Sequence, residues 1–112
     1  MKNKWRLIWS PAAKEDLLNM WRHYARVASP EIADKLLHEI EFAADRLKDD
    51  PLRWRLRMEV MPDLKGGLRS VLSHPYTVFY QLDDDDVRVV RVLHERQNFA
   101  AFLSDRPKRQ QS

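Results

Sequence analysis

The side chains best suited to chemistry in this sequence are arginines that alternate with apolar residues. Thirteen of the twenty basic residues are Arg, and three of them, Arg53, Arg55 and Arg57, stand at every second position. On an extended backbone this spacing places three guanidinium groups on one side and apolar side chains on the other. A guanidinium binds carboxylate or phosphate groups in a bidentate manner. The segment therefore predicts a macromolecule-binding surface, with an ordinary solvated face whose side-chain stems pack on the sheet as the alternative.

Four further arginines come from predicted strands or strand ends, namely Arg69, Arg88, Arg91 and Arg96. Arg69 and Arg91 have apolar neighbours within their strands, so we expect each to bond a specific acidic or carbonyl partner. The basic excess also lies in this half: residues 1–50 hold nine basic and nine acidic side chains, whereas residues 51–112 hold eleven and eight. Such a surface suits nucleic acid or an acidic protein, and the charge count does not choose between them.

The histidines and acidic residues form no metal-binding pattern. No two of the four histidines stand at i, i+4, and the sequence has no Cys,. The run Asp83–Asp86 lacks the glycine and the bidentate Glu of a calcium loop, so it predicts a solvated turn. Gly66 and Gly67 are the only glycines, which excludes a Gly-rich phosphate loop,. We expect no metal and no cofactor. His94 follows the last predicted strand and is either a binding residue or a polar strand end.

The elements that position these residues begin with a strand and two helices. Trp5, Leu7 and Trp9 alternate with Arg6 and Ile8, and this period of two with its aromatic content predicts a short first strand over 5–9,. Ser-Pro pairs then stand at 10–11 and 29–30, where Ser is a good N-cap and Pro is preferred at the first helical position,. Apolar residues at helical spacing follow each pair and predict helices near 11–27 and 30–48. The short connection between them makes an antiparallel helical hairpin.

The second half predicts three strands joined by tight turns. Gly66-Gly67 is a turn, and alternating residues predict strands over 68–73, 76–82 and 87–93 in an antiparallel meander,. We expect residues 51–65 to be irregular. The fold class is therefore α+β: an N-terminal strand, an antiparallel helical hairpin and a three-stranded antiparallel meander, forming one small sheet with helices packed on one face.

The last strand carries apolar residues on both of its faces. Strict alternation places Val90 and Val92 opposite Val87, Val89 and Leu93,. A second apolar face needs a cover, which is either a partner protein or the chain's own helices, its 51–65 segment and its tail. These two alternatives stay open on the sequence alone.

At 112 residues the chain is long enough for one core and one domain,. We expect this domain to span residues 1–103, with a polar basic tail over 104–112. No apolar run is long enough to cross a membrane, and the N-terminus has no secretory signal pattern. These features, with the absence of Cys, predict a cytoplasmic location and no membrane partner.

Five short motifs, in order, resemble the ParE branch of the ParE/RelE toxin superfamily. They are Ser10-Pro11-Ala12-Ala13-Lys14-Glu15-Asp16-Leu17, the second helix with Asp50-Pro51, Gly67-Leu68-Arg69-Ser70, Tyr76-Thr77-Val78-Phe79-Tyr80 and Arg91-Val92-Leu93-His94-Glu95-Arg96. The resemblance runs from about residue 5 to residue 103. It implies a RelE/ParE-like fold and the toxin of a type II toxin–antitoxin system, neutralised by a cognate ParD-like antitoxin in a hetero-oligomer. ParE-type toxins act on DNA gyrase.

RelE-type relatives instead cut mRNA in the ribosome, with basic residues and a C-terminal Tyr. The resemblance places Thr77 at the Arg position of the third strand and Phe102 near the Tyr position, Arg69 on the second strand where that pattern has lysines, and Arg96 at the Arg after the last strand. Proton transfer and charge stabilisation need groups that Thr77 and Phe102 lack. The resemblance thus favours a gyrase-directed toxin that is not a nuclease. A ribosome-dependent mRNA endonuclease and a non-toxic relative that only binds antitoxin are the alternatives.

The resemblance and the arginine pattern together give one set of predicted target- or antitoxin-binding residues. They are Arg53, Arg55, Arg57, Arg69, Arg91, His94 and Arg96, with Arg106, Lys108 and Arg109 of the tail as a further contact. We expect no catalytic residue and no sequence-specific DNA binding by the chain alone.

Overall fold

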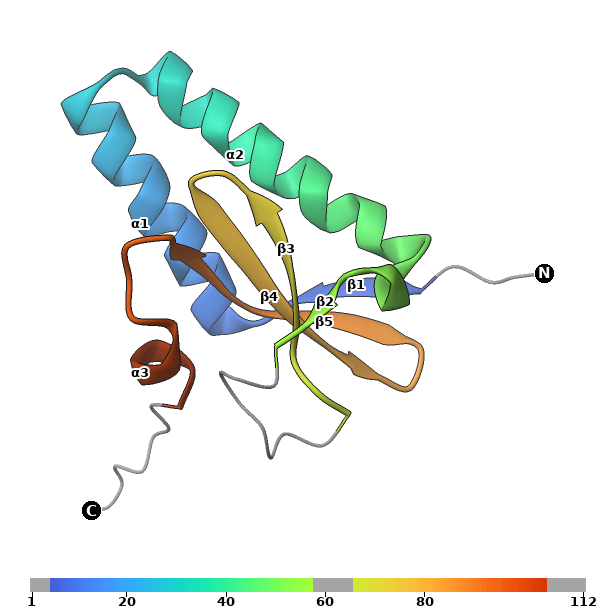
Figure 1. Ribbon diagram of the computed structural model, residues 1–112. Coiled ribbons are helices and arrows are strands. Elements are labelled where there is room, and N and C mark those ends of the chain that lie inside the picture. Colours follow the sequence, from blue (N-terminus) through green and yellow to red (C-terminus); the bar gives the residue numbers. More distant parts are fainter. Residues whose placement is uncertain (1–4, 58–65, 105–112) are drawn as a thin grey trace.

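The computed structural model describes residues 5–57 and 66–104 and has an α+β fold, as predicted (Figure 1). The predicted tail therefore lies almost wholly outside the described residues. The elements in order are β1 (Arg6–Trp9), α1 (Pro11–Val27), α2 (Pro30–Asp45), the 3-10 turns η1 (Arg46–Lys48) and η2 (Pro51–Arg53), β2 (Arg55–Leu56), β3 (Arg69–Ser73), β4 (Tyr76–Asp83), β5 (Asp86–His94) and α3 (Phe99–Ser104). Within the described residues, no helix has both the length and the apolar character needed to cross a bilayer.

The two Ser-Pro pairs begin the helices as predicted. The Ser10 hydroxyl accepts from the backbone N–H of Ala13, and the Ser29 hydroxyl accepts from that of Ile32. In each helix the following proline occupies the first turn, where its missing N–H costs nothing. The second helix ends as an α-helix at Asp45, and residues 46–48 continue it as a 3-10 turn. The helical hairpin is thereby confirmed, with one boundary shifted.

The strands form one five-stranded sheet in the order β1-β5-β4-β3-β2. β3, β4 and β5 are the predicted antiparallel meander, and β1 pairs with β5 in parallel. β2 is a two-residue edge strand within the stretch predicted to be irregular; residues 58–65 of that stretch lie outside the described residues. Gly66 and Gly67 both have φ of +80°, a left-handed conformation that favours glycine and explains the predicted turn,.

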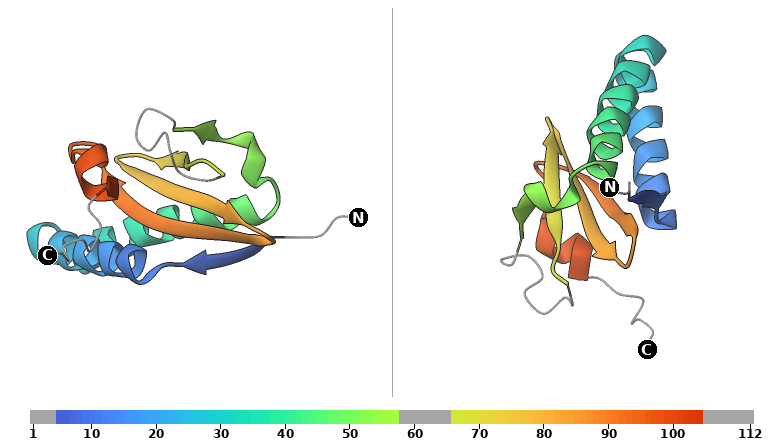
Figure 2. Two further views of the ribbon diagram at one scale, coloured as in Figure 1. Left: turned by 90° about the horizontal axis from the view of Figure 1, so that it is seen from below. Right: turned by 90° about the vertical axis from the view of Figure 1, so that its right-hand side faces the viewer.

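Helices α1 and α2 cover one face of the sheet (Figure 2). The helix-side core, as we name it, joins small and aliphatic residues of both helices to alternating residues of the strands. Its fully buried members include Ala13, Ile40, Val78, Tyr80 and Val89. Ala13 and Ala44 lie on the buried stripes of their helices, and their small side chains allow close approach to the sheet,.

A β-bulge in β5 places the valines of this strand on other faces of the sheet than predicted. Tyr80 pairs with Val89 but Phe79 pairs with Arg91, so Val90 is an extra residue in the ladder,. The extra residue reverses the alternation that follows it. Val92 consequently joins the helix-side core with Val87 and Val89, whereas Val90 and Leu93 lie on the opposite face. The expectation that Val90 and Val92 share one face was wrong, because strict period two does not hold across a bulge.

The second face is covered in part by α3, a short helix that the sequence analysis did not predict. Leu68, Phe79 and Leu93 are buried there, and Phe99 and Leu103 of α3 pack against them. This cluster is the α3-side core. Phe79 and Phe99 meet edge to face, with ring centroids 4.9 Å apart,. The chain therefore supplies a cover for this part of its second apolar face.

Candidate binding site

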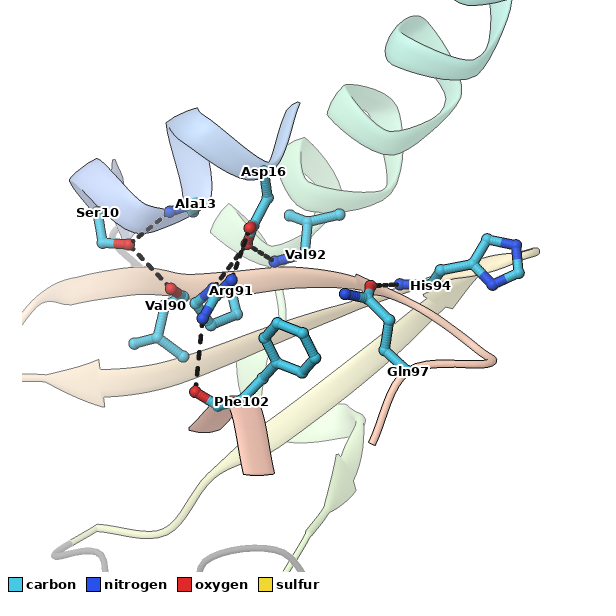
Figure 3. A network of polar contacts seen from close by, with 9 residues as sticks. All are labelled: Ser10, Ala13, Asp16, Val90, Arg91, Val92, His94, Gln97 and Phe102. Carbon is cyan, nitrogen blue, oxygen red and sulfur yellow. Dashed lines mark hydrogen bonds and ion pairs between the residues drawn. The ribbon is translucent and has the colours of Figure 1, made fainter. Parts of the chain in front are cut away.

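The Arg91 side chain forms a bidentate ion pair with Asp16 of α1 (Figure 3). Its Nε donates to Asp16 Oδ2 and its Nη2 donates to Oδ1, both at 2.8 Å. The backbone N–H of Val92 donates to the same Oδ2 at 2.8 Å. The two side chains are only 23% and 11% exposed, so the pair is largely removed from water. The predicted acidic partner of Arg91 is confirmed.

The position of this ion pair follows from the short length of β1. β1 ends at Trp9. The next residue, Ser10, donates from its backbone N–H to the carbonyl of Val89 and from its hydroxyl to the carbonyl of Val90. Beyond that point the edge of β5 has no neighbouring strand within the described residues. Asp16 takes the place of a neighbouring strand here, because its carboxylate accepts the hydrogen bond from the Val92 N–H. In a longer sheet a strand carbonyl would accept that hydrogen bond.

Helix α3 lies between two of the predicted arginines. The Arg91 guanidinium lies 5.4 Å from the ring centroid of Phe102 and donates to the Phe102 carbonyl at 3.4 Å. On the other side Arg57 lies 5.6 Å from the ring of Phe99 and 5.4 Å from that of Phe79. Arg57 also donates to the Ser70 hydroxyl at 3.0 Å. Both guanidinium groups thus hold α3 against the sheet through cation–π contacts.

Arg69 faces the opposite side of the sheet from Arg57. It pairs with Tyr80 of the helix-side core, and its Nη1 donates to the carbonyls of Leu52 and Trp54 at 3.2 and 2.8 Å. These are carbonyl partners of the predicted kind. The Tyr80 hydroxyl donates to the carbonyl of Pro51 in the same segment. Burial raises the pKa of Tyr80 well above its ordinary value, although the charge of Arg69 opposes that shift,.

The remaining predicted residues have different surroundings. Arg53 stacks on Trp54, with its guanidinium carbon 4.9 Å from the ring centroid, and Arg55 is an exposed residue of the edge strand β2. His94 ends β5, and its ring meets that of Tyr76 edge to face at 5.2 Å. The backbone N–H of Arg96 donates to His94 Nδ1 at 3.1 Å. Arg96 itself is exposed.

Two hollows adjoin these residues. The first has a volume of about 270 Å³ and lies between α1, the end of β5 and α3, with polar lining from Asp16, Asn19, His23, His94 and Gln97. The second has a volume of about 390 Å³ and lies on the second face of the sheet beside β2, lined in part by Arg55, Arg57 and Thr77. Among residues 5–57 and 66–104, no group of three His, Cys, Asp or Glu residues converges as metal ligands would.

The predicted arginines therefore form groups and not one continuous rim. Arg57 and Arg91 flank α3. Arg69 donates to a carbonyl of the segment that contains η2, and Arg53 stacks on Trp54 in that segment. Arg96 lies in the turn after β5. Sequence reasoning missed Asp16, because its partner lies 75 positions away and neither residue signals the other. It also missed α3, whose six residues carry too few turns for a periodicity signal,.

Comparison with known proteins places this small α+β chain among the toxins of toxin–antitoxin pairs. The chain matches the family model for the ParE toxin of the type II toxin-antitoxin system, parDE, over residues 7–99. It is 33% identical over 98 residues to Toxin ParE3 of Caulobacter vibrioides, covering 88% of this chain and 94% of that protein. Toxin ParE1 of Mycobacterium tuberculosis is 32% identical over 92 residues, covering 81% and 90%.

Among solved structures, the chain resembles one described as a chromosomal ParDE TA system from P. aeruginosa. The TM-score is 0.69 at 20% identity, over 81% of this chain and 96% of that one, so this likeness shows the fold. The family match covers most of the chain. The chain therefore belongs to the ParE toxin family of type II toxin–antitoxin systems.

Proposed function

We propose that this ParE-family toxin inhibits DNA gyrase by binding it, and that a cognate ParD-like antitoxin neutralises the toxin in a cytoplasmic hetero-oligomer. The observation that carries this proposal is the family match over residues 7–99. A gyrase-directed activity and an antitoxin partner are what the resemblance of the five motifs implies for such a chain.

The side chains at the positions that match the RelE nucleases support binding without cleavage. Thr77 is buried on β4 and Phe102 is an aromatic residue of α3, so neither offers a group that titrates near neutral pH,. Of the two basic residues at these positions, Arg69 is engaged within the chain by carbonyl partners, whereas Arg96 is exposed. At Arg69 a phosphate group would have to displace these carbonyl contacts.

The predicted binding residues then divide by role. We assign Arg53, Arg55 and Arg96 as contact residues, because their side chains are exposed. We assign Arg57, Arg69, Arg91 and His94 as positioning residues, because each contacts a neighbouring element or turn of the chain.

A supercoiling assay with purified gyrase tests the proposed activity. We expect the wild-type chain to inhibit supercoiling, and the antitoxin encoded beside its gene to restore it. We expect Arg55→Ala and Arg96→Ala to weaken inhibition several-fold, with Arg26→Ala, an exposed arginine in the last turn of α1, as the matched control.

Two other results would replace the proposal. New 5′ ends in translated messages, detected by primer extension after induction, would assign the chain to ribosome-dependent mRNA cleavage. Harmless overexpression with retained antitoxin binding would identify a non-toxic antitoxin-binding relative.

A further inference from the structure

An exposed stack of alternating aromatic rings and guanidinium groups lies where α2 ends and η2 begins. The guanidinium carbon of Arg46 is 5.8 Å from the ring centroid of Phe42 and 5.3 Å from that of Trp54. The guanidinium carbon of Arg53 is 4.9 Å from the same Trp54 ring. We name these four residues the arginine–aromatic ladder. None of the contacts of α3 or of the Asp16–Arg91 ion pair involves it.

Hydrogen bonds from the sheet fix the backbone of the Trp54 segment, which carries part of the ladder. Arg69 donates to the carbonyls of Leu52 and Trp54, and Tyr80 donates to that of Pro51, so three hydrogen bonds from the sheet fix the backbone that carries Trp54. The Trp54 side chain also packs against the helix-side core. A surface whose side chains are ordered before binding loses less conformational entropy when a partner docks.

The ladder is also open to a partner. Phe42 is 66% exposed and the adjacent Leu52 is 58% exposed. Within the described residues neither Arg46 nor Arg53 has a carboxylate partner, and the nearby Asp45 is paired with Lys48 at 2.8 Å. A guanidinium in cation–π contact with a ring still has N–H groups that can donate to a carboxylate. Trp, Arg and Phe held in this way are typical of interface hot spots.

We propose that the arginine–aromatic ladder is the docking surface for an acidic segment of the antitoxin, a proposal that rests on the proposed function. Carboxylates of that segment bind the N–H groups of Arg46 and Arg53, and an apolar side chain beside them packs on the exposed ring of Phe42. Charge complementarity identifies the segment as acidic, because the ladder contributes two positive charges that no described carboxylate neutralises.

A nucleic acid fits this surface less well than a peptide. Two guanidiniums already stack on the Trp54 ring, so the ring is not an open platform for a base,. A peptide can present its carboxylates to the two arginines alone.

Calorimetric titration of the full-length chain with a cognate ParD-like antitoxin tests the proposal. We expect Phe42→Ala and Arg46→Ala each to weaken binding at least tenfold, and the double variant more. Arg46→Lys keeps the charge but loses the planar fork, so we expect an intermediate loss. Arg26→Ala on α1 is the matched control and should bind as the wild type does. Far-UV circular dichroism and thermal unfolding check that each variant is folded.

The outcomes separate this inference from the proposed function. If the wild type does not bind the antitoxin, both are overturned. If folded Phe42→Ala and Arg46→Ala variants keep wild-type affinity, the inference alone is overturned. The same holds if these variants bind the antitoxin normally but lose gyrase inhibition, or lose affinity only for a single-stranded oligonucleotide.

Discussion

Asp16 and Arg91 are 75 positions apart, yet their side chains make the most extensively bonded contact of the candidate site. The Asp16 carboxylate accepts hydrogen bonds from the Arg91 guanidinium and from the backbone N–H of Val92 on β5. Arg91 in turn donates to the Phe102 carbonyl of α3. The pair therefore joins α1, β5 and α3. Removing one partner of a largely buried pair leaves the other charge without compensation, which is far more costly than losing an exposed pair.

We expect Asp16→Asn to lower the free energy of unfolding by about 2 kcal/mol, since some exposure reduces the penalty of a fully buried pair. Asp83→Asn is a matched control, because Asp83 pairs with Arg88 at the surface, where the two side chains are 58% and 39% exposed. That change should cost less than about 1 kcal/mol. Urea unfolding monitored by circular dichroism measures both. Equal losses in the two variants would contradict the role assigned to Asp16.

The buried hydroxyl of Tyr80 leads to a second prediction, on how the stability of the fold depends on pH. Burial raises the pKa of Tyr80 above its ordinary value of 10.0, and burial also raises that of Tyr76. A raised pKa in the folded state means that the native protein holds the proton more tightly than the unfolded chain does. The stabilisation is therefore complete below about pH 10 and is lost as the pH rises above it.

We expect the free energy of unfolding to fall above about pH 10, by up to about 1.4 kcal/mol per pH unit for each tyrosine. Tyr80→Phe should remove one of the two contributions. At neutral pH it should cost about 1 kcal/mol, because the Pro51 carbonyl loses its donor,. Urea titrations from pH 8 to pH 11 measure both effects. An unchanged alkaline slope in Tyr80→Phe would refute this explanation.

At the scale of elements, the two helices begin with the same residues but in different surroundings. Ser10 and Ser29 both cap a helix whose first residue is Pro. Ser10 also donates to the carbonyl of Val90, the extra residue of the β5 bulge, whereas the Ser29 contact is a local cap at an exposed site. Ser10 consequently ties the start of α1 to the point where β5 changes face.

We expect Ser29→Ala to cost about 1 kcal/mol, the usual value of an N-cap. Ser10→Ala should cost about 2 kcal/mol, because the Val90 carbonyl loses its donor as well,. Chemical denaturation of both variants provides the comparison, with each serving as the other's control. If the two losses are equal, the Ser10–Val90 bond adds nothing to stability.

At the scale of the whole molecule, one sheet serves two cores. Neighbouring residues of the same strand point to opposite sides: Tyr80 to the helix-side core and Phe79 to the α3-side core. Any loss of order in β4 or β5 therefore disturbs both cores. This arrangement predicts that α3 and the helical hairpin unfold together, as small single domains usually do.

Phe99→Ala tests that coupling. We expect a loss of about 2 kcal/mol, less than for a fully buried ring because Phe99 is half-buried,. Trp5, Trp9 and Trp54 pack against the opposite, helix-side core and report on it by fluorescence. The fluorescence and circular dichroism transitions should move together in this variant. A shift in one alone would show that α3 is a separate unit.

The sequence by itself determined the two long helices and the strands β1, β3, β4 and β5, because their signals are local; the short elements β2 and α3 were not predicted. The helix predicted over 11–27 is α1 (Pro11–Val27), since its cap, its proline and its apolar stripe all lie within the segment itself. The strand meander and the acidic turn at Asp83–Asp86 follow from alternation and turn residues in the same way. The class of partner for Arg69 and Arg91 was also predictable, since a cation among apolar neighbours needs an acceptor,.

Only the tertiary structure decided which residues meet. The bulge at Val90 depends on how two strands pair, so no pattern within β5 reveals that Val92 and Leu93 exchange faces. The choice of Asp16 for Arg91, and of the Leu52 and Trp54 carbonyls for Arg69, depends on where β1 ends and η2 begins. Contacts between segments distant in the chain are set by packing geometry, and a residue carries no mark of a partner that folding brings to it.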